Sequence, residues 1–168
     1  DTVRERAQVK KLVGYMPQRF GLYQDLTVEE NIDFFMDIFG IRGQERQQRK
    51  ERYLSFSNLL PFLDRPAGAL SGGMKQKLGL ACVLVHQPKV LILDEPTEGI
   101  QPNIVSMIGD IIRKLIDEIG LTVLLVEQKL PFARRVGDNF VILDRGRAVA
   151  SGDMPQLNDE LIKQYLTV

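Results

Sequence analysis

The sequence contains few of the residues that build disulfide frameworks and zinc sites. It has one cysteine, Cys82, and one histidine, His86, in 168 residues. A single cysteine cannot form a disulfide within the chain, and a single histidine is not typical of a zinc site. We interpret Cys82, which lies in the apolar run at 80–85, as a small core residue. We interpret His86 as a structural or surface residue.

The sequence also has no excess of charge of either sign. Lys+Arg and Asp+Glu number 22 each, so the formal net charge is zero. Proteins that bind nucleic acid need a clustered positive surface, so we expect no nucleic-acid partner. Basic residues gather at 42–52, but Glu45 and Glu51 interrupt them, which favours a solvated helix face.

Long apolar runs are missing. The longest runs have about six residues, and a helix that spans a bilayer needs about 20. The chain begins neither with Met nor with a signal-peptide pattern. We therefore expect any membrane role to come through a partner.

Helical and strand patterns alternate along the chain, which predicts an α/β fold with a parallel core sheet. The apolar runs at 90–93 and 122–126 predict neighbouring buried strands, and a third strand is expected at 13–16. Thr27 and Glu30 have the spacing of a capping box and predict the start of a helix. Further helices are expected at 44–60, 71–85, 103–119, 130–136 and 157–166, and final strands at 140–144 and 148–151.

This pattern predicts a helical subdomain inserted into a sheet. The helical subdomain covers about 19–86, and residues 1–18 and 87–168 form the core. The whole chain, 1–168, is then one domain.

An acidic pair, Asp94 and Glu95, follows the predicted strand at 90–93. Ligands of open α/β sheets bind at the carboxyl ends of the strands. The first carboxylate can hold Mg²⁺ and the second can polarise a water for attack on a phosphate. By itself the pair is equally compatible with a turn that caps a helix.

Ser71, Gly72 and Gly73 form a second feature, 23 residues before Asp94 when counted from Ser71. Serine followed by two glycines opens a predicted helix. The backbone amides of a helix N-terminus bind anions, and glycines permit close approach of a phosphate. As an isolated string, Ser-Gly-Gly is also common in loops.

Four segments, at 15–18, 70–74, 90–95 and 122–128, resemble the motifs of the ABC (ATP-binding cassette) ATPase family in order and spacing. The resemblance covers essentially the whole chain. It implies the P-loop NTPase fold with a RecA-like core, MgATP as substrate and Mg²⁺ as cofactor. It also implies that Gln18 is the Q-loop glutamine, which contacts Mg²⁺ or the attacking water. Asp94 would hold the magnesium, and Glu95 would be the catalytic glutamate.

The resemblance assigns a second group to the ATP that is held by an opposite subunit. Ser71, Gly72 and Gly73 match the signature motif, and Gln101 lies in the D-loop region at 98–102. Gln128 occupies the switch position and is expected to be catalytic. That position is usually His; glutamine can hydrogen-bond a phosphate but cannot become a cation. Met74 and Gln101 also depart from the usual Gln and Asp.

The P-loop motif Gly-x-x-x-x-Gly-Lys-Ser/Thr does not occur in the 168 residues. The P-loop does most of the triphosphate binding in this class, so we expect the isolated chain to be inactive as an ATPase. We further expect the chain to be a truncated cassette, or one piece of an assembly.

Residues up to about Pro96 resemble export-type ATPases, and those from Thr97 resemble branched-chain amino acid or urea uptake ATPases. A composite or engineered sequence is one explanation of that mixture.

The resemblance implies a motor subunit that couples ATP hydrolysis to solute transport. Its expected partners are a second ABC ATPase subunit, in a head-to-tail dimer, and transmembrane transporter subunits. The expected location is cytoplasmic, on the inner face of the cell membrane through those partners. The alternative is a non-catalytic fragment that keeps the signature and coupling surfaces but cannot bind ATP alone. A third hypothesis is a soluble ABC protein of repair or translation. Such proteins usually carry long coiled-coil or duplicated segments, and this sequence shows neither.

Overall fold

The computed structural model describes residues 4–166 of the chain. The chain divides into two compact units, and the boundary lies between Gln128 and Lys129. The two units are described separately.

The first unit contains three parallel strands and five α-helices among its described residues. Both of the chain's acidic and glycine motifs lie in it. Its elements are α1 (Arg6–Leu12), β1 (Val13–Met16), α2 (Val28–Ile38), α3 (Gly43–Phe56), η1 (Leu60–Phe62), η2 (Ala67–Ala69), α4 (Gly72–Leu84), β2 (Val90–Asp94), α5 (Pro102–Ile119) and β3 (Thr122–Val126). The short helix α1 was not predicted from the sequence.

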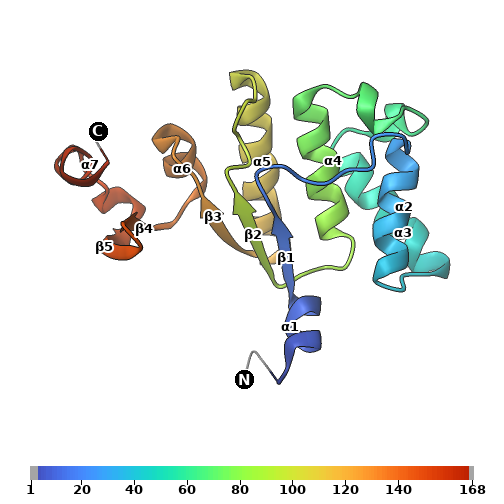
Figure 1. Ribbon diagram of the computed structural model, residues 1–168, viewed down its shortest axis with the longest axis horizontal. Helices are drawn as coiled ribbons and strands as arrows, with labels where there is room; N and C mark the ends of the chain where they lie inside the picture. Colours follow the sequence, from blue (N-terminus) through green and yellow to red (C-terminus); the bar gives the residue numbers. More distant parts are fainter. Residues whose placement is uncertain (1–3, 167–168) are drawn as a thin grey trace. The chain divides into compact units, whose positions relative to one another are not determined.

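The three strands form one sheet in the order β1-β2-β3, and both pairs are parallel. Leu91 of β2 lies opposite Gly14 on one side and Val123 on the other. The prediction that the runs at 90–93 and 122–126 are neighbouring parallel strands is therefore confirmed. Figure 1 shows these strands side by side, with α4 next to β1 and with α2 and α3 beyond α4.

The prediction that the strand at 122–126 is buried is wrong. Leu124 and Val126 are 56% and 47% exposed, whereas Leu91 and Leu93 of β2 are 0% and 1% exposed. The reason is the alternation of side chains along a strand. One face of the sheet packs on α4 and α5, and Leu124, Val126 and Tyr15 lie on the other face, which stays open to solvent.

Helix α2 begins where the sequence predicted. Thr27 Oγ1 accepts a hydrogen bond from Glu30 N at 3.1 Å, and Thr27 N donates to Glu30 Oε2 at 2.8 Å, which is the reciprocal capping box. The buried face also includes Asn31, whose side chain bonds the backbone of Tyr23, Leu26 and Thr27. These bonds fix the segment between β1 and α2.

Helix α4 is the centre of the helical part, because it contacts α2, α3, α5 and β1. Cys82 lies in its buried face, and burial raises the pKa of the Cys82 thiol. His86 follows the helix, stacks on Phe39 with the ring centroids 4.0 Å apart, and has Nε2 3.3 Å from Val13 O. Both residues therefore have the structural positions that the sequence suggested.

No strand runs through 44–60, which α3 and η1 occupy for the most part.

The second unit, described to residue 166, is a β-hairpin with short helices. Strands β4 and β5 are antiparallel and are joined at Arg145 and Gly146, which both have positive φ. The elements are α6 (Leu130–Val136), β4 (Asn139–Asp144), β5 (Arg147–Asp153), η3 (Met154–Gln156) and α7 (Asp159–Tyr165). Across residues 4–166, no helix has both the length and the apolar character to cross a membrane.

Candidate functional site

The carboxyl ends of the three parallel strands bring four predicted site residues together. Gln18 follows β1, Asp94 ends β2, Glu95 comes next, and Gln128 follows β3. Gln18 and Glu95 are 77 residues apart in sequence, yet Gln18 Nε2 donates to Glu95 Oε2 at 2.9 Å. This edge of an open α/β sheet is where ligands bind in such folds.

The Glu95 carboxylate lies between two glutamine side chains. Besides the bond from Gln18, Gln128 Nε2 donates to Glu95 Oε1 at 2.6 Å. Each carboxylate oxygen thus has its own amide donor, which fixes the plane of the carboxylate. The sequence placed both glutamines near a phosphate, a water or a metal, and the structure adds that they bond the acidic residue itself.

Glu95 has an unusual backbone. Its φ is +46°, in the left-handed region that glycine favours, so the extended strand ends at Asp94. A residue held in such a conformation costs about 1–3 kcal/mol and persists only where its surroundings fix it. The alternation of side chains along an extended chain therefore does not continue from Asp94 to Glu95. Their side chains nonetheless have different partners.

Asp94 is bonded by a residue that the sequence analysis did not assign to the site. Tyr15 Oη donates to Asp94 Oδ2 at 3.2 Å. Desolvation and the hydrogen bond to this carboxylate raise the pKa of Tyr15. The alternation of side chains on adjacent parallel strands could have found the pair, because Tyr15 lies opposite Ile92, two residues before Asp94.

Oxygen atoms that suit Mg²⁺ are available at this edge. Asp94 supplies a carboxylate and Gln18 an amide oxygen, and Mg²⁺ commonly takes one or two protein oxygens and completes its shell with water and substrate phosphates. Within residues 4–166 there is no group of three or more His, Cys, Asp or Glu residues that could hold a metal. At Asp94 and Gln18, substrate phosphates and water would complete the shell of a bound Mg²⁺.

The other predicted residues form a second cluster, where α4 and α5 begin. Ser71 is the N-cap of α4, and its Oγ accepts from Met74 N at 3.3 Å. Gln101 is the N-cap residue of α5. Ser71, Gly72 and Gln101 are exposed. This cluster offers the backbone amides of a helix N-terminus to an anion.

Gly73 differs from Gly72 because it is buried against α5. A Cβ atom at Gly73 would overlap Ile104 Cγ2, whereas a Cβ at Gly72 would lie 3.5 Å from Ile100 Cδ1, an ordinary contact. The second glycine thus lets the two helices approach, whatever it does toward a phosphate. From the sequence, the glycines were expected only to permit close approach of a phosphate.

We expect Gly73→Ala to destabilise the 168-residue chain by about 1–3 kcal/mol, because it overfills the contact with Ile104. Gly72→Ala is the matched control, and its effect is expected to stay below about 0.5 kcal/mol. Urea unfolding followed by circular dichroism measures both. Ile104→Ala should remove most of the penalty of Gly73→Ala; equal penalties in the two backgrounds would show that Ile104 is not the obstacle.

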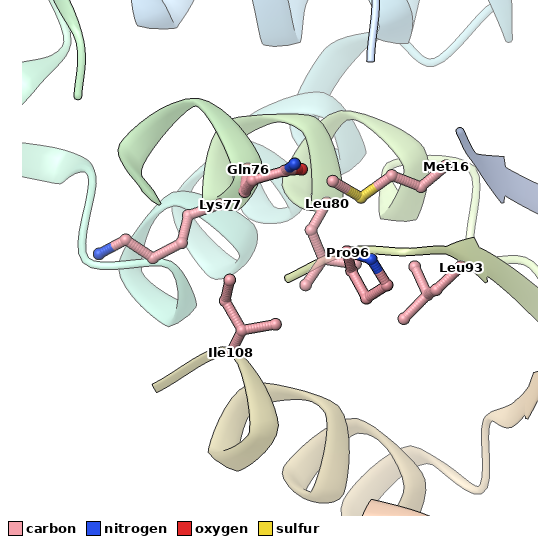
Figure 2. A pocket seen from close by; sticks show the side chains of 7 residues that line it. All are labelled: Met16, Gln76, Lys77, Leu80, Leu93, Pro96 and Ile108. Atoms are coloured by element: carbon pink, nitrogen blue, oxygen red, sulfur yellow. The ribbon is translucent and has the colours of Figure 1, made fainter. Parts of the chain in front are cut away.

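A small cavity lies beside the turn that follows Glu95. It lies under Pro96, between β1, β2, α4 and α5, and its walls are mostly apolar (Figure 2). Its volume is about 10 Å³, close to the smallest space that holds one water molecule. The turn after Glu95 therefore rests directly on α4 and α5. The lining residues are Met16, Gln76, Lys77, Leu80, Leu93, Pro96 and Ile108.

A parallel sheet with an acidic pair at its carboxyl edge, beside exposed helix N-termini, defines an α/β protein of the phosphate-binding class. Residues 1–98 match the ABC transporter family. The chain therefore belongs to this family, as the sequence motifs predicted.

Three known proteins illustrate the similarity. The chain is 40% identical over 161 residues to the probable multidrug ABC transporter ATP-binding protein YbhF of Escherichia coli K12, covering 96% of this chain and 28% of YbhF. CbiO1 from Clostridium perfringens, part of the ABC transporter complex cbiONQ, superposes with a TM-score of 0.84 and 26% identity, over 96% of this chain and 65% of CbiO1. The ATP-binding cassette MJ0796, solved as a dimer bound to ADP and Pi, has a TM-score of 0.76 and 27% identity, over 90% of this chain and 67% of MJ0796.

These matches establish the fold as that of ABC ATPase nucleotide-binding domains. The chain spans less than a third of the length of YbhF. The alignment with YbhF covers 161 residues and so extends across both the export-like and the uptake-like parts of the sequence. A composite origin stays a prediction.

Proposed function

We propose that this chain is part of the ATP-hydrolysing motor subunit of an ABC membrane transporter. The observation that carries the proposal is the Glu95 carboxylate, held between Gln18 and Gln128 at the carboxyl edge of the sheet. A positioned carboxylate of this kind can accept a proton from a water molecule that attacks a phosphate.

In this proposal the residues divide by role. Glu95 is the general base, and Gln18 and Gln128 orient it and the attacking water. Asp94, with Gln18, would hold Mg²⁺, which when bound neutralises charge on the transferred phosphate. Tyr15 donates its hydrogen bond to Asp94 Oδ2. The other carboxylate oxygen, Oδ1, would then face a metal-bound water.

The second cluster acts on a different nucleotide. The amides at the start of α4, with Ser71, Gly72 and Gly73, would contact the ATP held by a second ABC ATPase subunit, together with Gln101. The related cassette MJ0796 was solved as a dimer, which supports a second cassette as partner, and in this proposal the two are arranged head to tail. Transmembrane subunits would bind the helical subdomain, about 19–86, and keep the protein on the inner face of the membrane. Residues 1–18 and 87–168 would form the core.

A non-catalytic role for the isolated chain is the second candidate, because the 168 residues contain no Gly-x-x-x-x-Gly-Lys-Ser/Thr motif. We expect the isolated chain to bind MgATP more weakly than micromolar, since micromolar binding requires about −8 kcal/mol. Isothermal titration calorimetry on the chain, beside the full-length protein that contains it, measures the difference. Micromolar affinity of the isolated chain would contradict the expectation. Absence of Mg²⁺-dependent ATP hydrolysis by the full-length protein with its partners would contradict the proposed function.

A further inference from the structure

Glu127, the residue between β3 and Gln128, bonds two segments that meet at the site. Its Oε2 accepts from Thr97 Oγ1 at 2.7 Å, and its Oε1 accepts from Gln128 N at 3.0 Å. Glu127 and Thr97 are 30 residues apart in sequence. The carboxylate is therefore directed at the protein rather than at the open edge of the sheet.

Thr97 belongs to the turn that carries Glu95. It is fully buried, at 0% exposure, and Ile100 N donates to its carbonyl oxygen at 3.3 Å. The turn is closed by Glu98 N, which donates to Glu95 O at 3.1 Å, and Glu95 N donates to Val126 O at 2.9 Å. The left-handed backbone of Glu95 is thus held by Glu98, in the same turn as Thr97, and by Val126 at the end of β3.

Gln128 lies on the other side of Glu127. Its backbone amide is held by Glu127 Oε1, and its side chain donates to Glu95 Oε1 at 2.6 Å. One carboxylate therefore fixes both the backbone from which Gln128 reaches Glu95 and the turn on which Glu95 stands. A carboxylate can accept two such bonds at once, and hydrogen bonds to an ionised acceptor are stronger than neutral ones.

We propose that Glu127 is a positioning residue, which sets the separation of Glu95 and Gln128 by bonding Thr97 and the Gln128 amide together. This inference rests on the proposed function, in which Glu95 is the base. In this role Glu127 acts through Glu95 and Gln128 rather than on the substrate. Its chemistry predicts a graded series: alanine loses both bonds, whereas glutamine accepts from the Gln128 amide with Oε1 and donates to Thr97 Oγ1 with Nε2.

The first test measures the link without ATP. In the 168-residue chain, Thr97→Val is expected to lower the equilibrium constant for folding about 10-fold, the scale of one hydrogen bond, and Glu127→Ala, which loses two bonds, at least 10-fold. Because both variants remove the bond between Thr97 and Glu127, the double variant is expected to lower it by much less than the product of the two single effects. Thr97→Ser keeps the hydroxyl and serves as the folded control. A fully multiplicative double variant would overturn the proposal.

The second test measures turnover in the full-length protein with its partners. Glu127→Ala is expected to lower kcat for ATP hydrolysis at least 10-fold with KM for ATP within threefold, and Glu127→Gln to recover most of the loss. In a Glu95→Gln background, Glu127→Ala should cause little further loss, which a merely structural defect would not reproduce. Glu118→Ala, on the exposed end of α5, is the matched control.

The outcomes separate the two proposals. Suppose that the wild-type protein hydrolyses ATP and that kcat of Glu127→Ala is within threefold of the wild-type kcat. This result would overturn the positioning role and leave the proposed function intact. No turnover in the wild-type protein would overturn both.

Discussion

Replacing Glu95 with Gln in the full-length protein is expected to lower ATP hydrolysis by at least about 100-fold and to leave ATP binding nearly unchanged, the usual scale for a positioned base. Glutamine keeps the size of the side chain and removes its negative charge, so it cannot take the proton from the attacking water. The loss of charge also relieves repulsion with the γ-phosphate, which protects binding.

The local geometry should survive this change. Gln18 and Gln128 each donate to one Glu95 oxygen, at 2.9 and 2.6 Å. In the Glu95→Gln variant, either Gln18 or Gln128 would face the new amide nitrogen at position 95. That glutamine can rotate its own carboxamide group and present its oxygen as the acceptor. The backbone at φ +46° is unaffected, because the substitution changes only the end of the side chain.

A turnover assay with a parallel ATP-binding measurement decides the matter. Glu118→Gln is the control, because Glu118 is an exposed carboxylate at the end of α5 whose Oε1 lies 3.8 Å from Lys114 Nζ. If Glu95 serves only the turn at Pro96 and Thr97, Glu95→Gln will hydrolyse ATP within threefold of the wild-type rate. That result would remove Glu95 from the catalytic assignment.

The second large effect concerns the core of the sheet. Leu91→Ala is expected to destabilise the 168-residue chain by about 2–5 kcal/mol, the range for buried leucines. Leu91 is 0% exposed in the central strand, and its side chain lies on the face that packs against the helices. The cost combines the lost transfer of the side chain from water with the cavity that remains.

Leu124→Ala is the matched control, since it makes the same chemical change in the neighbouring strand of the same sheet. Leu124 is 56% exposed on the other face, so we expect a loss below about 1 kcal/mol. Urea unfolding followed by circular dichroism compares the two variants. Equal losses would mean that the open face of β3 is covered in solution.

Several local features could be predicted because they depend on a few consecutive residues. The capping box of Thr27 and Glu30 and the N-cap of Ser71 both form as expected, since each bond closes within three residues. The apolar run at 90–93 predicted β2 for a similar reason, because a strand with both faces partly covered needs apolar residues in succession.

The run at 122–126 shows where this reasoning fails. Its composition matches that of β2, yet Leu124 and Val126 are exposed. Composition records what a strand can bury, whereas the order β1-β2-β3 and the position of the helices decide what it does bury. Leu124 and Val126 lie on the face of the sheet opposite to the one that packs on α4 and α5.

The sequence by itself determined the family of this protein, the alternation of helices and strands, and the residues Asp94, Glu95, Gln18 and Gln128 as the candidate site. Residue types, spacing and local capping carry that information within short segments. Only the tertiary structure decided that two glutamines bond Glu95, that Tyr15 bonds Asp94, that Gly73 admits Ile104, and that Glu127 joins Thr97 to Gln128. Each of those contacts joins residues from separate elements, so it depends on how strands and helices are brought together and not on the order of residues along the chain.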